Sequence, residues 1–289
     1  MALHKFFTKH HIILHKGKNW HILLTLAWNQ ILLLKLRIYK RLHNIHRPIV
    51  HYYAVCWNEE RMLPFVFRHY DQFVDHYTFY DNYSDDSSEE IIHSHKNTSI
   101  VKFKTEGFDD VAHISIKNNC WKCSRGKADY VIVCDIDEFA FSSNLRKYLQ
   151  HIHTNHVSMP NPIGFNMYSK TFPSINNALN ITDQVKTGVQ DNGYSKCILF
   201  DPHRVVEINY DAGAHICHPY GQIVRGGEYK VLHYKNLDLE LVLERTVINA
   251  HRLSPTNLKM NLGYAYLYPE ERIRKEFEDN IEISTIVTE

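Results

Sequence analysis

The chain has 289 residues, of which 44% are hydrophobic, so it has enough apolar material for a full core and is not a disordered protein. Its 33 Lys and Arg residues nearly balance 32 Asp and Glu residues, so bulk charge gives no reason to expect a nucleic-acid partner. Six cysteines in a chain of this length do not make a disulfide framework and favour a cytoplasmic compartment.

The first predicted element is an amphipathic helix in a basic segment, residues 1–47. This segment carries many Lys, Arg and His residues and no Asp or Glu, and its apolar run from Trp20 to Tyr39 is interrupted by Lys35 and Arg37. A spanning helix needs about 20 nearly uninterrupted apolar residues, which disfavours a span here. Two interpretations remain open: peripheral contact with the inner face of the cytoplasmic membrane, or packing on the main domain or a partner subunit.

From Pro48 onward, strands and helices alternate along the chain. Apolar and β-branched runs predict strands at residues 49–56, 76–80, 99–104 and 130–134. This alternation predicts an α/β fold, with a mostly parallel sheet that has helices on both sides. The second half is less regular, and we expect loops over residues 158–180 because they are rich in Asn, Pro and Ser. Short strands and C-terminal helices are then expected at residues 196–200, 230–233, 237–253 and 269–280.

Three of the predicted parallel strands end in polar, acidic turns. These turns are Asn58-Glu59, Asp81-Asn82 and Asp135-Ile136-Asp137. Ligands in such sheets bind beyond the carboxyl ends of the strands, so the turns predict one binding site at a common edge. Asp135 and Asp137 are two residues apart after a buried strand, so both carboxylates point to one side and could share a cation. Mg²⁺ and Mn²⁺ prefer such oxygen ligands and can neutralise a diphosphate.

At this motif the chain resembles a known family. Asp135-Ile136-Asp137-Glu138-Phe139 resembles the D-x-D-E-F signature of glycosyltransferase family 2-like and family 92-like proteins, which have the GT-A fold. Further blocks match the family in the same order between Tyr52 and Tyr266. They are Trp57-Asn58-Glu59-Glu60, Tyr80-Asp81-Asn82-Tyr83-Ser84-Asp85-Asp86, Ala128-Asp129-Tyr130, Lys196-Cys197-Ile198, Gly213-Ala214-His215 and Leu232-His233-Tyr234. One departure is Gly263-Tyr264-Ala265-Tyr266, which has Ala where relatives often place a His.

The resemblance implies a hexosyltransferase-like enzyme that moves a sugar from a nucleotide-sugar donor to a hydroxyl group of a glycan or glycolipid acceptor. It implies a GT-A domain over residues 48–289, built on a Rossmann-like mixed sheet flanked by helices. This domain has a nucleotide-binding half (48–155) and an acceptor half with the C-terminal helices (156–289). It also implies a divalent cation, Mn²⁺ or Mg²⁺, held by Asp135, Asp137 and His233, with His215 as a competitor for the third place. The substrate-binding residues implied are Asn58, Glu59, Asp81, Asn82, Asp86, Glu138, Lys196 and His215.

The catalytic base is left open. An inverting enzyme needs a carboxylate, or less often a His, to take the acceptor proton. Glu228 lies at about the distance after the metal motif where several GT-A enzymes place their base. Asp191 lies in a polar, glycine-containing loop that could reach the acceptor.

Two other functions fit parts of the pattern. A nucleotidyltransferase would normally carry a Gly-rich phosphate loop after the first strand, where this chain has Asn58-Glu59-Glu60. A non-catalytic nucleotide-sugar binding protein would be favoured by missing carboxylates, and none is missing from the two central motifs. The basic, apolar N-terminus suggests a membrane-associated acceptor, so we expect a role in cell-surface polysaccharide or lipopolysaccharide synthesis.

Overall fold

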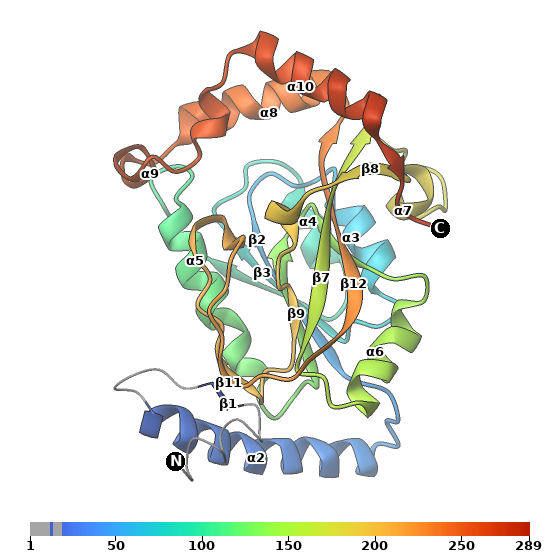
Figure 1. Cartoon of the computed structure of the whole chain (residues 1–289), viewed down its shortest axis with the longest axis vertical. Helices are drawn as coiled ribbons and strands as arrows, with labels where there is room; N and C mark the ends of the chain where they lie inside the picture. Colours follow the sequence, from blue (N-terminus) through green and yellow to red (C-terminus); the bar gives the residue numbers. More distant parts are fainter. Residues whose placement is uncertain (1–11, 14–18) are drawn as a thin grey trace.

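The computed structural model describes residues 12–13 and 19–289, so residues 1–11 and 14–18 of the predicted basic segment lie outside the described part. Figure 1 shows a body of sheets and helices between two end layers. Helix α2 (Asn19–Leu42) runs along one end, and helices α8 (Leu239–Arg252) and α10 (Glu270–Ile283) cross the opposite end. The described strands form three sheets.

The first sheet has the strand order β4-β3-β2-β5-β9. Its parallel strands are β2 (Val50–Cys56), β3 (His76–Asp81), β4 (Thr98–Lys102) and β5 (Tyr130–Asp135), and the short edge strand β9 (Leu199–Phe200) is antiparallel. The connecting helices are α3 (Leu63–Tyr70), α4 (Ser88–Ser94), α5 (Asp110–Asn119) and the 3₁₀ turn η1 (Cys120–Ser124). The predicted α/β fold with a Rossmann-like mixed sheet flanked by helices is therefore confirmed.

The second sheet has the order β13-β8-β7-β12-β6. Its strands are β6 (Glu138–Phe141), β7 (Met159–Ser169), β8 (Thr187–Gln190), β12 (Arg225–Leu237) and β13 (Thr285–Ile286). The long strand β12 pairs in parallel with β7 and antiparallel with β6. The remaining helical elements are α6 (Leu145–Thr154), α7 (Ile181–Gln184), α9 (Pro255–Met260), η2 (Asn192–Tyr194), η3 (Ala212–Ala214) and η4 (Tyr264–Leu267).

Strand β7 (Met159–Ser169) corrects the first part of the prediction of loops over residues 158–180, whereas residues 170–180 lie in neither a helix nor a strand. Pro160 and Pro162 suggested a loop because proline cannot donate to a strand ladder. Both prolines lie an even number of residues before Gly164, so their backbone nitrogens point to the same side as the Gly164 N–H, which points away from β12 and donates to Ser195 Oγ at 3.0 Å. The missing N–H groups of the prolines therefore remove no hydrogen bond from the β7–β12 ladder.

A chain of aromatic side chains joins the two large sheets and positions the turn after β5. The ring of Tyr52 on β2 lies 5.0 Å from that of Tyr70 on α3, and Tyr70 stacks on Phe139 of β6 at 5.7 Å. Phe139 contacts Tyr234 of β12 edge to face at 5.2 Å. All four side chains are buried, so β2, α3, β6 and β12 meet in a rigid core beside the predicted metal motif.

Helix α2 packs on the body through one face. Its Ile22 and Leu26 contact Val206 of β10 (Val205–Glu207), which belongs to a small sheet with β1 (Ile12–Ile13) and β11 (Tyr220–Gln222). The buried Asn29 donates to the carbonyl of His203 at 2.8 Å. Packing on the main domain, one of the two interpretations of this segment, is thus observed. Among the helices described, α2 alone has the length and apolar composition to cross a membrane.

Candidate active site

The three acidic turns lie side by side at the carboxyl edge of the parallel sheet, as predicted. Asp135 at the end of β5 is in register with Val55 of β2, and the next residue of β2, Cys56, is in register with Asp81 of β3. Polar side chains from all three strand ends therefore surround one part of the surface. This arrangement follows from parallel pairing, which brings equivalent ends of neighbouring strands together.

Asp81 and Asn82, which were predicted to bind substrate, are engaged by the protein itself. The fully buried Asp81 carboxylate accepts hydrogen bonds from Ser84 Oγ at 2.5 Å and from Lys102 Nζ at 2.7 Å. The Asn82 amide donates to Thr105 Oγ1 at 2.7 Å. These two side chains shape the loops of the site and leave few free polar atoms for a ligand.

The loop after β2 is held against the loop after β3 by matched polar contacts. Asn58, with a left-handed backbone (φ 53°), donates to Asp85 Oδ1 at 2.5 Å and accepts from the Asp85 N–H at 3.0 Å. The Asp86 carboxylate accepts from the N–H groups of Glu60 at 3.1 Å and Ser88 at 2.9 Å. Asp86 thus fixes the geometry of the two loops, and the Glu59 carboxylate of the first loop lies close enough to Asp137 and Asp135 that burial and the charges of these two residues raise its pKa.

Asp135 faces two lysines that the sequence analysis did not place beside it. Lys117 of α5 donates to Asp135 Oδ1 at 2.6 Å, and Lys196 Nζ lies 3.6 Å from Oδ2. Burial alone would raise the pKa of Asp135, but the two ammonium groups outweigh it and hold the pKa at about 2. The Asp135 carboxylate is therefore ionised and already compensated by positive charge.

Lys196 and Glu138 form a buried ion pair. The two side chains are 4% and 1% exposed, and Lys196 Nζ donates to Glu138 Oε1. Burial lowers the pKa of Lys196, but the Glu138 and Asp135 charges more than offset this, so the pKa lies above its ordinary value. Both residues were predicted to bind substrate, whereas the structure places their charges against each other in the core.

Asp137 lies opposite His233, as predicted for two ligands of one cation. Asp137 Oδ2 is 3.5 Å from His233 Nε2, and the Asp137 carbonyl accepts from the N–H of Tyr234 at 2.8 Å. Burial would raise the pKa of Asp137, but His233 and the more distant Arg245 bring it below its ordinary value. The β6–β12 pairing, with His233 in register with Glu138, sets this geometry.

A hydrogen-bond chain orients the His233 ring from behind. His233 Nδ1 lies 2.9 Å from Asn166 Oδ1 on β7, and Asn166 Nδ2 donates to Asp191 Oδ2 at 2.9 Å. Because Asp191 accepts from the amide nitrogen, the amide oxygen faces the imidazole and Nδ1 must donate. Nε2 is then the ring nitrogen directed at Asp137, and it is the nitrogen that a metal bound between the two groups would take as its ligand.

Tyr194 and His215 complete this wall of the site. Tyr194 stacks on His233 with ring centroids 4.2 Å apart, and its edge contacts His215 at 5.2 Å. His215 Nδ1 also hydrogen-bonds to the Gly193 carbonyl at 2.6 Å. His215 is exposed and separated from Asp137 by the Tyr194 and His233 rings, so His233 is the imidazole that faces the metal motif.

Arg245 and Lys235 add positive charge that the sequence analysis missed. Arg245 of α8 donates to Glu59 Oε1 at 2.6 Å. Burial raises the pKa of Glu59 to about 7 against the opposing effect of Arg245. Lys235 lies over the Tyr266 ring at 4.8 Å, and burial lowers its pKa despite the attraction of Asp137. Arg245 is 186 residues from Glu59, so no local pattern could have revealed this pair.

The predicted cation site fits the structure in part. The described residues contain no group of three or more His, Cys, Asp or Glu side chains arranged to hold a metal. Asp137 and His233 fit as two neighbouring ligands, since a carboxylate oxygen and an imidazole nitrogen face each other. The Asp135 carboxylate instead faces the ammonium groups of Lys117 and Lys196.

The two predicted bases lie in different places. Glu228 is exposed and five residues before His233 on β12, which amounts to roughly 16 Å along a strand, so the structure does not bring it to the site. Asp191 lies close behind the site, but its carboxylate accepts from Asn166 and from the N–H of Gly193 at 2.8 Å. Neither carboxylate is free beside Asp137.

Comparison with protein-family models and with curated proteins finds no match for this chain. Among solved structures, the chain is similar to S. aureus TarS residues 1–349, with a TM-score of 0.40 and 11% identity over 79% of this chain and 70% of that one. The same protein in complex with UDP-GlcNAc gives 0.38 and 10% over 79% and 71%. GalNAc-T7 with UDP, GalNAc and Mn²⁺ gives 0.31 and 12% over 42% of this chain and 24% of that one. At such low identities a function has to be argued from this chain's own residues.

Proposed function

We propose that this chain is a glycosyltransferase of the GT-A type, which transfers a sugar from a nucleotide-sugar donor to a hydroxyl group of a glycan or glycolipid. One observation carries the proposal: Asp137 and His233 face each other at the carboxyl edge of the parallel sheet, beside Arg245 and Lys235. A carboxylate and an imidazole supply two cation ligands, and cationic side chains match the charge of a diphosphate. The D-x-D-E-F resemblance supports the same assignment.

In this proposal Asp137 and His233 hold a divalent cation, Mn²⁺ or Mg²⁺, which would neutralise the charge of the diphosphate leaving group. Asp135 serves differently from the original expectation, because its carboxylate orients Lys117 and Lys196. Donor oxygens would complete the coordination of the cation, since Mg²⁺ and Mn²⁺ are commonly shared between carboxylates and substrate phosphates.

Asp191 is proposed as a positioning residue. It fixes the Asn166 amide, and Asn166 in turn holds His233 in the tautomer whose Nε2 faces Asp137. Glu59, with its carboxylate paired to Arg245, would contact the nucleoside part of the donor. The nucleotide-binding half would thus be residues 48–155, and residues 156–289 would supply His233, Arg245 and the acceptor surface.

The proposed acceptor is a membrane-associated glycan, in cell-surface polysaccharide or lipopolysaccharide synthesis on the cytoplasmic side. The exposed apolar residues of α2 and the basic N-terminal segment support this part of the proposal. A second candidate function is a non-catalytic nucleotide-sugar binding protein. It is favoured because neither predicted catalytic base, Glu228 or Asp191, offers a free carboxylate beside Asp137. Donor binding without any sugar transfer or slow donor hydrolysis would favour this second function.

The test is a calorimetric titration of the purified chain with UDP-, GDP- and CMP-sugars, with and without Mn²⁺. We expect one donor class to bind more tightly with Mn²⁺, and Asp137→Ala to abolish the Mn²⁺-dependent part while the thermal midpoint is retained. Asp279→Ala, which removes an exposed carboxylate of α10, is the matched control. Failure of every donor to bind under every metal condition would overturn the proposal, as would undiminished Mn²⁺-dependent binding by Asp137→Ala.

A further inference from the structure

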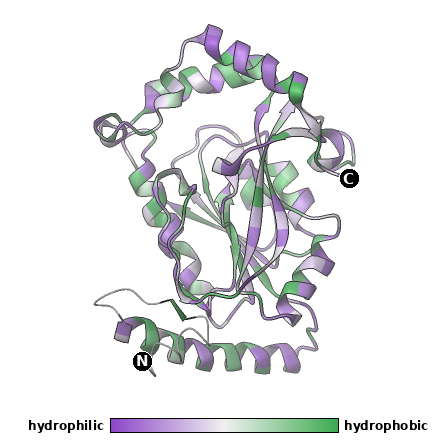
Figure 2. Cartoon of the chain, viewed as in Figure 1, coloured by the Kyte–Doolittle hydropathy of each residue, from purple (hydrophilic) through white to green (hydrophobic). Residues whose placement is uncertain are grey.

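Helix α2 leaves a hydrophobic face uncovered on the side away from the body. Its buried residues Ile22, Leu26, Asn29 and Leu36 recur at intervals that keep them on one stripe. At about 100° per residue, the large exposed apolar residues centre about 180° from that stripe. They are Trp20, Leu24, Trp28, Ile31, Leu34, Ile38 and Leu42, and Trp20 and Leu42 are more than three-quarters exposed at 79% and 77%. Figure 2 shows hydrophobic residues recurring along most of this helix.

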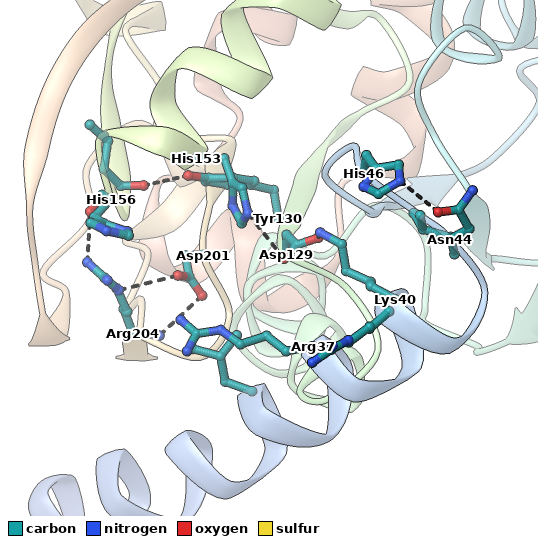
Figure 3. A pocket seen from close by; sticks show the side chains of 14 residues that line it. Arg37, Lys40, Asn44, His46, Asp129, Tyr130, His153, His156, Asp201 and Arg204 are labelled. Carbon is teal, nitrogen blue, oxygen red and sulfur yellow. Dashed lines mark hydrogen bonds and ion pairs between the residues drawn. The ribbon is translucent and has the colours of Figure 1, made fainter.

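A cavity of about 440 Å³ lies between the C-terminal half of α2 and the body. Figure 3 shows Arg37 and Lys40 of α2 on one side of it, and Asp129, His153, Asp201 and Arg204 of the body on the other. Asp129 directly precedes β5, whereas Asp135 ends the strand. The cavity is therefore at the opposite end of the parallel sheet from the candidate active site.

Both carboxylates in the cavity wall are already engaged. Asp129 Oδ2 accepts from Lys40 Nζ at 2.7 Å and from the N–H of Ile49 at 2.8 Å. Asp201 Oδ1 accepts from the N–H of His203 at 2.7 Å, and Asp201 Oδ2 lies 3.6 Å from Arg204 Nε. These contacts leave no free acidic group in the described wall to neutralise further cations.

Two arginines at the mouth of the cavity have no such partner. Arg37 and Arg41 are exposed, and neither forms a hydrogen bond or ion pair with residues 12–13 or 19–289. The two are four residues apart, so they lie on the same flank of α2, between its buried stripe and its exposed apolar face. Free guanidinium groups beside an apolar face match the boundary between phosphate headgroups and acyl chains.

The charge of the whole chain is also unevenly distributed, with positive charge concentrated in the N-terminal segment that contains α2. Residues 1–50 contain nine Lys and Arg residues and no Asp or Glu, so the rest of the chain has 24 basic against 32 acidic residues. An anionic surface would attract the α2 end and repel the remainder. The same distribution disfavours a second copy of this chain as the cover for α2, because two basic segments would then face each other.

We propose that α2 lies in the surface of an anionic membrane and that the cavity beside it takes the phosphate headgroup of one phospholipid. The apolar face of α2 enters the acyl boundary, and Arg37 and Arg41 donate hydrogen bonds to the phosphate oxygens. This inference rests on the membrane contact in the proposed function, but it does not depend on binding of the sugar donor. It adds a defined binding site for one lipid headgroup to the general attraction between basic residues and an anionic membrane.

The test is flotation of the full chain with vesicles of phosphatidylcholine alone, or of phosphatidylcholine mixed with phosphatidylglycerol. We expect stronger binding to the mixed vesicles, and a loss of about tenfold or more in the partition coefficient for Arg37→Gln/Arg41→Gln. Lys259→Gln/Lys275→Gln removes the same charge from exposed positions on α9 and α10, and should stay within about twofold of wild type because screening weakens distant charges. Circular dichroism checks that each variant is folded.

Equal binding to both vesicle types, or equal losses in the two charge variants, would overturn the headgroup site. If the wild type bound inorganic phosphate but no vesicles, and Arg37→Gln/Arg41→Gln did not bind phosphate, the cavity would be a site for a soluble anion. Dimerisation without vesicle binding would assign the apolar face to a second copy, and both results would overturn the inference. Donor titration of the same arginine variant should be unchanged, so the membrane site and the transferase proposal can fail separately.

Discussion

The buried pair Lys196–Glu138 allows its contribution to stability to be predicted in advance. The two side chains are 4% and 1% exposed, so removal of one charge leaves the other without water and without its main partner. Lys196→Met keeps an unbranched chain of similar length and removes the ammonium group. Breaking a buried pair in this way costs about 3–5 kcal/mol, and we expect the free energy of unfolding to fall by that amount.

A second variant separates the buried charge from the lost packing. Lys196→Met/Glu138→Gln removes both charges, and replacing a whole buried pair is often close to neutral. We therefore expect the double variant to recover most of the stability lost by Lys196→Met. Glu276→Gln, in the exposed pair of Arg272 and Glu276 (50% and 52% exposed), is the matched control and should leave the free energy of unfolding nearly unchanged because water screens this pair.

Urea unfolding followed by tryptophan fluorescence measures these free energies by linear extrapolation. A loss below about 1 kcal/mol for Lys196→Met, the range of exposed pairs, would refute the description of this pair as buried. An equal loss in the double variant would show that packing of the lysine chain, not the charge, supports the core. If Lys196 instead bound substrate directly, Lys196→Met would weaken donor binding without a loss of stability.

Two further predictions concern pH and metal affinity. Burial lowers the pKa of His69, whose Nε2 donates to the Ala140 carbonyl at 2.9 Å, to about 4. In the unfolded chain His69 binds a proton near pH 6.5, so the free energy of unfolding should fall by up to roughly 3 kcal/mol as the pH falls from 6.5 to 4. In urea titrations, His69→Gln should make the free energy of unfolding less dependent on pH. An unchanged pH dependence would contradict the assignment to His69. Asn166→Leu removes the hydrogen bonds that connect His233 to Asp191, so it should lower the Mn²⁺ affinity about 10–100-fold, as measured by calorimetry in the presence of UDP. If the variant also lost the binding of UDP without metal, Asn166 would not act only by orienting His233.

The parallel sheet could be predicted because its strands carry their own signal. The run before Asp135 is continuously apolar, as a strand covered on both faces requires, and the structure has β5 at Tyr130–Asp135. Neighbouring parallel strands must end at one edge, so the meeting of Asp81 with the turn after Cys56 followed from the topology. The pairing of Asp137 with His233 could be expected only from the resemblance, since the two residues come from different sheet segments.

The parts that escaped prediction depend on long-range contacts. Lys117 and Arg245 reach the site from α5 and α8, and nothing in their local sequence distinguishes them from surface cations. Pro160 and Pro162 concealed β7, because the sequence alone does not show that β8 pairs only with Phe165–Met167 and leaves the nitrogen side of the prolines without a partner strand. Glu228 was chosen by its distance along the sequence, but an extended strand converts five residues into a separation too large for proton transfer.

Strand β5 also sets how far the reaction lies from the proposed membrane. Its beginning is tied to α2 by the contact of Lys40 with Asp129, and its end carries Asp135. The six residue steps from Asp129 to Asp135 span about 20 Å at about 3.3 Å per residue. With α2 on a lipid surface, a single sugar attached directly to a lipid phosphate would fall short of the donor. The height of the sheet would therefore select acceptors that already carry an extended glycan, and lengthening that glycan would bring its end to the site.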